Sequence, residues 1–213
     1  MQIDIFSDTI CPWCYIGKRR LERALAERPQ EDVTIRWRAF QLNPDMPAEG
    51  MDRQTYLDVK FGGRENADRV YDAVKQASAE EDLPFRFDRI VRTPNTLESH
   101  RLLRFAAERK RQDALLEKLF EAYFEQGRDI GSHEVLTELA VDVGLDGSEV
   151  KAFLESDEGR EEAAAEDQMA RRHGIQGVPT FIFNGRYAVS GAQQPEVFFQ
   201  MFDLARESES AEA

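Results

Sequence analysis

Cysteine is scarce in this sequence, because Cys11 and Cys14 are the only two among 213 residues. A single pair excludes a small scaffold held together by several disulfides, and a crosslink across so short a loop would add little stability. A zinc ribbon would need a second cysteine pair, and His100, His133 and His173 are too far apart in the sequence to form a compact ligand motif. We therefore predict no metal site.

Long apolar runs are absent as well. No segment approaches the roughly 18 consecutive apolar residues that a membrane-spanning helix requires. The first residues, MQIDIFSD, contain neither a basic segment nor a long apolar segment of the kind that secretory signal peptides have. Both absences predict a cytoplasmic protein without a membrane partner.

Positive charge is outweighed by negative charge. The 28 Lys and Arg residues face 41 Asp and Glu residues, which gives a formal net charge of -13. This imbalance disfavours binding to nucleic acids and to anionic membranes, since both would repel the chain. The apolar content of 41% suits one globular unit with a substantial core and room for a large insertion.

The first 42 residues predict a strand, a helix and a second strand. Residues 2–7 and 33–42 alternate between polar and apolar side chains, which is typical of strands with one buried face. Residues 12–28 have helical spacing of their apolar side chains, and Pro12 suits the first helical turn. Together these segments form a βαβ unit, so we expect the two strands to pair in parallel.

The remaining sequence is helical in the middle and mixed at the end. Residues 51–156 have mostly helical periodicity, and the stretch 82–96 is the one long exception. The final part predicts a helix at 157–173, a hairpin at 180–190 around the turn Asn184-Gly185, and a helix from about Pro195.

The two cysteines stand where the helix at 12–28 begins. The first lies beside unsatisfied backbone N–H groups and the positive end of the helix dipole, and both favour its thiolate. We therefore assign Cys11 as the exposed attacking nucleophile and Cys14, one turn further in, as the covered resolving thiol. The alternative is a pair of inert structural thiols. The basic run Lys18-Arg19-Arg20 is predicted to be a solvated helix face.

A proline stands at an unusual position in the segment Val178-Pro179-Thr180. It directly precedes a strand that has the pattern of a buried one, where proline is rare. A cis Val178–Pro179 peptide bond would explain why proline is tolerated there. A trans proline at the first residue of the strand is the alternative.

Several motifs together resemble the DsbA-like branch of the thioredoxin superfamily and, within it, the FrnE-type cytosolic members. They are DTICPWCYIGKRRLERAL, RAFQLNPDMP, TPNTLESHRLLRFA and GIQGVPTFIFNGRYAVSGAQ, and the resemblance covers nearly the whole chain. It implies an α/β protein with a thioredoxin fold and a large all-helical inserted domain. Residues 1–43 and 157–213 would form the thioredoxin domain, and residues 44–156 would form the insertion.

The resemblance also implies a function, that of a protein disulfide oxidoreductase or isomerase acting on substrate proteins or on small thiols and disulfides. It places a cis Val178–Pro179 bond against the cysteine pair and assigns backbone groups of Val178 and Thr180 to an extended substrate segment. Pro12 and Trp13 would line the site. No bound cofactor is expected, and glutathione or a thioredoxin-type protein would serve as redox co-substrate. The sequence predicts no particular oligomeric state.

The two residues between the cysteines bear on the strength of the oxidant. Some relatives carry a histidine there, whereas Pro12 and Trp13 supply neither a positive charge nor an additional hydrogen-bond donor to Cys11. We therefore predict a disulfide that is only moderately oxidising.

Two further residues and two other functions complete the predictions. Asp8 and His100 are candidates for proton transfer, and their ordinary alternatives are a turn former and a structural histidine. Kappa-class glutathione transferases and 2-hydroxychromene-2-carboxylate isomerases resemble the chain in layout but usually have serine at the position of Cys11. A glutathione-dependent transferase or isomerase of small aromatic compounds is therefore the second hypothesis. A holdase chaperone that uses the groove around Trp13 is the third.

Overall fold

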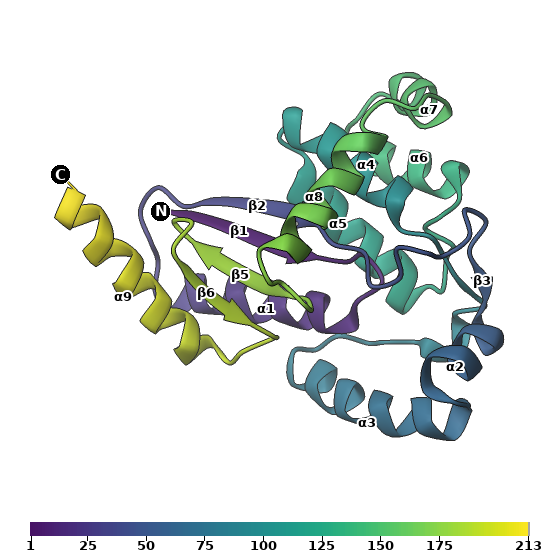
Figure 1. The fold of residues 1–213 in the computed structure, drawn as a ribbon, viewed down its shortest axis with the longest axis horizontal. Coiled ribbons are helices and arrows are strands. Elements are labelled where there is room, and N and C mark those ends of the chain that lie inside the picture. Colours follow the sequence, from purple (N-terminus) through teal and green to yellow (C-terminus); the bar gives the residue numbers. More distant parts are fainter. Residues whose placement is uncertain (213) are drawn as a thin grey trace.

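A four-stranded mixed sheet supports the helix that begins with the cysteines (Figure 1). In the computed structural model, which describes residues 1–212 and their side chains as far as Ser208, the strand order is β2-β1-β5-β6. The strands are β1 (Gln2–Ser7), β2 (Thr34–Ala39), β5 (Thr180–Phe183) and β6 (Tyr187–Ser190). As predicted, β1 and β2 are parallel, and the hairpin of β5 and β6 is antiparallel.

One face of the sheet is covered by α1 (Pro12–Glu27) and α9 (Pro195–Glu212). The alternation along β1 sends Ile3 and Ile5 to this face, where both are fully buried. The antiparallel register places Phe183 opposite Ile3 and Phe181 opposite Ile5, and the Phe181 ring meets Phe198 of α9 at 4.9 Å between centroids.

The other face is partly covered by α8 (Arg160–Arg172), which packs Ala170 against Phe6 and Phe40. The predicted strand 33–42 is longer than β2 because the pairing with β1 ends at Ser7, opposite Ala39. The free edge of β2 is covered by α8. The Ala39 N–H donates to the Glu166 carboxylate at 2.7 Å, and the Gln41 N–H donates to Asp167 at 2.8 Å. Side chains of α8 thus accept the N–H groups on the edge of this segment that faces away from β1.

The other half of the molecule is mainly helical (Figure 1). It consists of α2 (Arg53–Phe61), α3 (Arg64–Glu80), the 3-10 turn η1 (Phe87–Arg89), α4 (Leu97–Glu108), α5 (Gln112–Phe120), the π-helical turn η2 (Glu121–Glu125), α6 (His133–Asp142) and α7 (Gly147–Glu155). The strands β3 (Met51–Asp52) and β4 (Arg92–Thr93) form a small antiparallel pair within it. The prediction of a helical insertion did not include this short pair, since two-residue strands leave no alternation to detect in the sequence.

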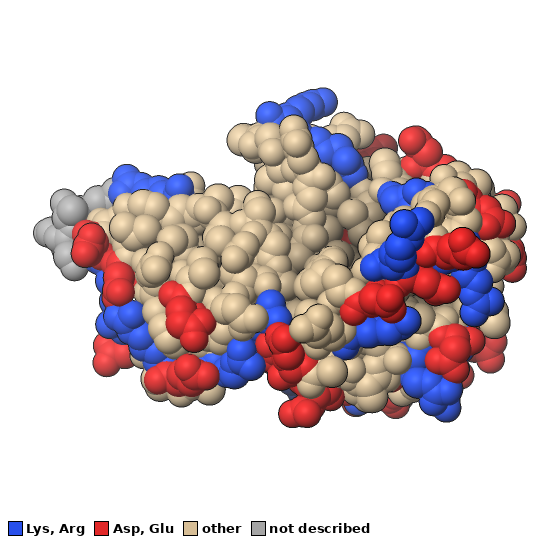
Figure 2. Space-filling model, turned by 90° about the horizontal axis from the view of Figure 1, so that it is seen from below, with Lys and Arg blue, Asp and Glu red and all other residues tan. Residues whose placement is uncertain are grey.

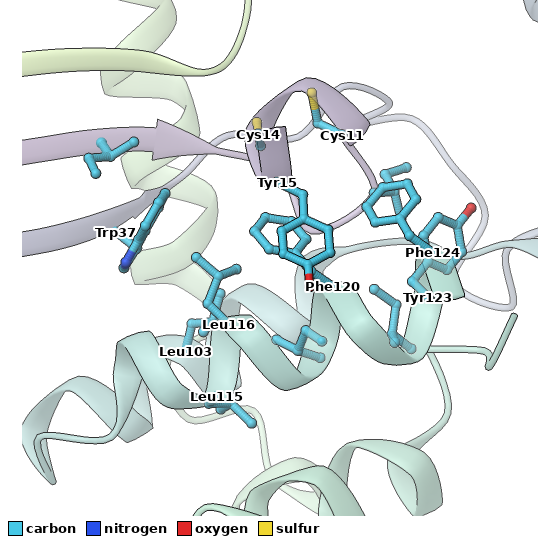
Figure 3. Packing of buried hydrophobic residues seen from close by; sticks show 14 of the residues in the cluster. Cys11, Cys14, Tyr15, Trp37, Leu103, Leu115, Leu116, Phe120, Tyr123 and Phe124 are labelled. Carbon is cyan, nitrogen blue, oxygen red and sulfur yellow. The ribbon is translucent and has the colours of Figure 1, made fainter. Parts of the chain in front are cut away.

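A continuous apolar core joins the sheet to the helical half through α1. Tyr15 leaves the side of α1 opposite the sulfur atoms, and its ring stacks on Phe120 at 4.8 Å between centroids and on Phe85 at 5.7 Å (Figure 3). The Tyr15 hydroxyl donates to the Glu117 carboxylate at 2.9 Å. The division of the chain at residues 43 and 156 stays a prediction.

Charges of both signs are mixed on the surface. Figure 2 shows acidic and basic side chains side by side on the helical half, and a broad uncharged area on the half that carries the sheet. Among the described residues, no helix combines the length and the apolar character needed to cross a membrane.

Candidate active site

The cysteines lie on the first turn of α1, immediately after β1. Cys11 is the N-cap residue, Pro12 occupies the first helical position, and the Cys14 N–H donates to the Cys11 carbonyl oxygen at 3.0 Å. Both cysteines are free thiols, and Figure 3 shows their sulfur atoms on the same side of this turn. No acidic residue lies in the first turn and no side chain caps the helix there. Cys11 therefore stands at the positive end of the α1 dipole, and the first turn of the helix places no carboxylate of its own there.

Cys11 is buried, so the prediction of an exposed nucleophile was wrong. Its exposed fraction is 3%, because the loop before β5 covers it. The Cys11 thiol donates to the Val178 carbonyl oxygen at 3.6 Å. The position of Cys11 at the start of a helix does not reveal that a segment 167 residues further along the chain covers its side chain.

Cys14 is fully buried, as its predicted role as the covered thiol requires. Burial raises the pKa of the Cys14 thiol well above its usual value, and the neighbouring Cys11 raises it further. The Ser7 hydroxyl and the backbone of Asp8 act in the opposite direction, since both stabilise a thiolate. Cys14 is therefore held as a thiol, with the Ser7 hydroxyl beside its sulfur.

The loop before β5 packs directly on α1. The Val178–Pro179 peptide bond is cis. A Cβ atom on Gly17 would lie 3.0 Å from the Pro179 ring and 3.2 Å from the Phe181 ring, so only glycine allows this approach without displacement. The far side of the loop is tied to the sheet, because the Gly191 N–H donates to the Pro179 carbonyl oxygen at 2.7 Å. Gly17 thus fixes the distance between the loop and the cysteines.

Thr180 and the two residues between the cysteines complete the predicted lining. The Thr180 hydroxyl donates to the Gly177 carbonyl oxygen at 2.9 Å, which closes the loop on itself. Pro12 is partly exposed, and Trp13 is partly exposed and packs against the core. A groove of about 570 Å³ runs along the loop, and its walls include Val178, Pro179 and Thr180. The roles of these residues in binding a substrate stay predictions.

Asp8 and His100 lie together although 92 positions separate them in the sequence. Asp8 is fully buried and His100 is 3% exposed, and the Asp8 Oδ1 and His100 Nε2 atoms are 3.4 Å apart. The second carboxylate oxygen of Asp8 accepts the Leu42 N–H at 2.6 Å. The backbone of Asp8 also forms the turn before the helix, since its carbonyl oxygen accepts the Cys11 N–H at 3.0 Å. Asp8 is therefore both a turn former and one half of a buried polar pair.

The basic run after the cysteines is not a solvated helix face. Lys18 is 3% exposed and lies 3.0 Å from the Glu117 carboxylate of α5. Arg20 is 5% exposed and lies 2.8 Å from Glu81. Because these cations are matched by carboxylates of the helical half, they join α1 to that half. The predicted solvated face was wrong since the sequence does not reveal these distant partners.

Sequence comparison agrees with this geometry. Residues 2–203 match the family model described as DSBA-like thioredoxin domain. The chain belongs to this family. The predicted fold class and the family resemblance are thereby confirmed.

Individual relatives of this DSBA-like chain cover almost its full length. The crystal structure titled probable DsbA oxidoreductase SCO1869 from Streptomyces coelicolor is 38% identical, with a TM-score of 0.88 over 97% of this chain and 90% of that one. The uncharacterized protein YwbO of Bacillus subtilis (strain 168) is 28% identical over 93% of this chain and 94% of its own length. The cytosolic disulfide reductase DsbM from Pseudomonas aeruginosa, solved with GSH, shares the fold at 19% identity and a TM-score of 0.68, over 97% of this chain and all of that one.

The sequence did not point to two residues of the helical half near the thiols, Arg53 and Tyr71. The Arg53 guanidinium donates to the Tyr71 hydroxyl at 2.6 Å and to the Thr93 hydroxyl at 3.0 Å. Burial raises the pKa of the Tyr71 phenol, Arg53 opposes this, and the nearby Cys11 adds to the rise. Both residues belong to polar helices, and no spacing in those helices marks them. Only the tertiary fold brings Tyr71, with Arg53 bound to its hydroxyl, into the electrostatic range of Cys11.

The pKa of Cys14 predicts how the stability of the reduced protein depends on pH. The folded state keeps a proton on Cys14 at pH values where an unfolded cysteine, with a pKa of about 8.5, has released it. The free energy of unfolding should therefore fall above about pH 8.5, by up to about 1.4 kcal/mol per pH unit from this group. Denaturant unfolding of the reduced protein at a series of pH values measures the slope.

The matched control is Cys14→Ala, measured under the same reducing conditions. Buried tyrosines such as Tyr15 and Tyr123 have raised pKa values and add a similar loss at higher pH, but they are unchanged in the variant. Cys14→Ala should show a flatter dependence over this range. Equal slopes in the two proteins would contradict the raised pKa.

Proposed function

We propose that this chain is a thiol–disulfide oxidoreductase in which Cys11 attacks and Cys14 resolves. The observation that carries the proposal is the placement of two free thiols on the first turn of α1, beneath the Val178–Pro179 loop of a DSBA-like fold. Cys11 is the N-cap residue of α1 with its thiol against the Val178 carbonyl oxygen, whereas Cys14 is a fully buried thiol inside the helix. The two thiols therefore differ in environment as an attacking and a resolving group should.

The chemistry takes place in two exchanges. The Cys11 thiolate attacks one sulfur of a substrate disulfide, the substrate S–S bond breaks, and the other substrate sulfur leaves as a thiolate. The Cys14 sulfur then loses its proton and attacks Cys11, which releases the second substrate thiolate. The protein ends with a Cys11–Cys14 disulfide and the substrate with two thiols, so one electron pair passes from protein to substrate. The reverse sequence oxidises a dithiol.

The groove along the Val178–Pro179 loop suits an extended substrate segment. Val178 and Thr180 flank the proline and lie in the wall of this groove, next to Cys11. The partly exposed Trp13 adds an apolar contact. We assign the groove to the chain that surrounds a protein disulfide, or to a small disulfide. Because Cys11 is covered in the free protein, the substrate must displace part of this cover.

A small thiol or a thioredoxin-type protein in the cytoplasm would return the protein to its starting redox state. The support for glutathione is the DsbM neighbour, which was solved with GSH. A 2-hydroxychromene-2-carboxylate isomerase shares the fold at 16% identity and a TM-score of 0.70, but the retained Cys11 and Cys14 favour redox chemistry over an isomerase or transferase reaction.

Cysteine substitutions test the proposal. Cys11→Ser should abolish the reduction of insulin disulfides, because no attacking thiolate remains beside the loop. Cys14→Ser should retain the first exchange and accumulate a mixed disulfide with the substrate, visible as a reducible adduct by mass spectrometry.

The double variant Cys11→Ser/Cys14→Ser is the control for activities that need no thiol. If the double variant prevents the aggregation of a test protein as well as the unmodified chain does, that activity needs no thiol and the result favours the holdase hypothesis. Insulin reduction that survives Cys11→Ser would overturn the oxidoreductase proposal. Saturable glutathione binding without any exchange would favour the transferase or isomerase.

The residues between the cysteines predict the reduction potential. Pro12 and Trp13 provide no charge that would stabilise the Cys11 thiolate, and burial favours the protonated form of Cys14. The potential should therefore be more negative than about -120 mV, the value of a strongly oxidising DsbA. Equilibration with glutathione buffers measures it.

The matched variant for this measurement is Trp13→His, which places a donor and a potential positive charge beside the pair. It should shift the potential toward more oxidising values, since a stabilised thiolate favours the reduced form. A potential of the unmodified protein as high as that of the strong oxidants, or no shift in Trp13→His, would contradict the assignment.

A further inference from the structure

The resolving step raises the question of where the Cys14 proton goes. Cys14 is fully buried and must lose its proton before its sulfur can attack Cys11. The thiol of its neighbour Cys11 faces the Val178–Pro179 loop, along which the proposed substrate would bind. The Ser7 hydroxyl lies close enough to lower the pKa of Cys14, is 97% buried, and has no hydrogen-bond partner among the described residues.

A small cavity lies beside Ser7, and among the described residues its lining includes none from the Val178–Pro179 loop. Its volume is about 10 Å³, close to the volume that one buried water occupies on this measure. Ser7, Thr9, His100 and Glu166 are among the residues that line it. The Ser7 hydroxyl and the His100 Nε2 atom lack hydrogen-bond partners among the described residues, although both are buried. Unsatisfied buried polar groups of this kind are rare and call for a physical explanation.

The cavity adjoins a solvent-filled groove on the other edge of the sheet. The groove has a volume of about 500 Å³ and shares Trp37, Arg38, Arg104 and Glu166 with the wall of the cavity. Glu166 is 6% exposed and stands between the two spaces, with its Oε1 atom 2.8 Å from Arg38. The groove lies along β2, whereas the Val178–Pro179 loop precedes β5 on the opposite side of β1.

We propose that Ser7 and His100 form a proton relay between Cys14 and the groove along β2, so that the resolving thiol is deprotonated from the side opposite the substrate. This inference rests on the oxidoreductase function proposed above and adds two residues to it. As the Cys14–Cys11 bond forms and the Cys11–substrate bond breaks, the Cys14 proton passes to the Ser7 oxygen. The Ser7 proton moves through one water to the His100 imidazole, and the substrate sulfur leaves as a thiolate.

The charges around His100 suit a transient imidazolium. Asp8, from the turn before α1, places its carboxylate Oδ1 atom 3.4 Å from Nε2. Glu166 of α8, Arg38 of β2 and Arg104 of α4 line the same cavity, and Glu166 lies between the two arginines at 2.8 and 3.7 Å. His100 is therefore paired with the Asp8 carboxylate, whereas both arginines are paired with Glu166. Once the substrate has left, the proton on His100 is released to solvent through the groove.

The test measures the two exchanges separately. Formation of the mixed disulfide is followed in the Cys14→Ser background, and its resolution is followed by rapid mixing as the substrate thiol is released from Cys11. Ser7→Ala and His100→Gln should each slow the resolution step at neutral pH by about tenfold or more. This size is expected because a positioned proton acceptor usually contributes at least that much to the rate. The deficit should shrink toward about pH 9, where hydroxide removes thiol protons directly.

The first control is His133→Gln, which changes a histidine of α6 whose side chain is 46% exposed. The second control is the rate of mixed-disulfide formation. Formation should stay within about twofold in both relay variants, and this rate also reports that each variant is folded. Unchanged resolution in Ser7→Ala and His100→Gln, with normal formation, would overturn the relay alone. Absence of any mixed disulfide in Cys14→Ser would overturn the oxidoreductase function and the relay with it.

Discussion

The close contact between Gly17 of α1 and Pro179 of the loop before β5 is the constraint on which the site depends. It brings together two segments that are 162 positions apart, and it leaves room for nothing larger than a hydrogen atom on Gly17. The first turn of α1 is thereby pressed under the loop, and the Cys11 sulfur comes within hydrogen-bond distance of Val178. The sheet supplies the other half of the constraint, because β5 pairs with β1, which leads directly into α1.

The same helix meets the helical half on its other side. Tyr15 stacks on Phe120, and Lys18 and Arg20 pair with carboxylates of that half. α1 is thus held in position from two directions, with its first turn free of side-chain capping. A thiol that changes its bonding partners needs a fixed backbone, since a Cys-x-x-Cys pair cycles between dithiol and disulfide with little movement.

The sequence alone was sufficient for the features that depend on short-range patterns. The alternation in β1 and β2, the helix that follows Cys11, and the Asn184-Gly185 turn, where both residues have positive φ angles, lie where the patterns predicted them. These features depend on side-chain periodicity and turn chemistry, which are local properties.

The features that the sequence did not reveal depend on long-range contacts. Cys11 is covered by a segment 167 residues away, and the charges of Lys18 and Arg20 are matched by carboxylates on other helices. Tyr71 and Arg53 approach the thiols only through the fold of the helical half. Burial and charge pairing of this kind are properties of the tertiary structure, so no pattern within one helix or strand predicts them.

The central claim is that two buried thiols of unequal character form one redox unit. The most direct measurement is the intact mass of the reduced protein after treatment with one equivalent of a small disulfide. The claim predicts a product about two mass units lighter than the starting protein and without an adduct, since Cys14 expels the reagent from Cys11. A stable adduct on either cysteine, or an unreacted protein, would contradict it.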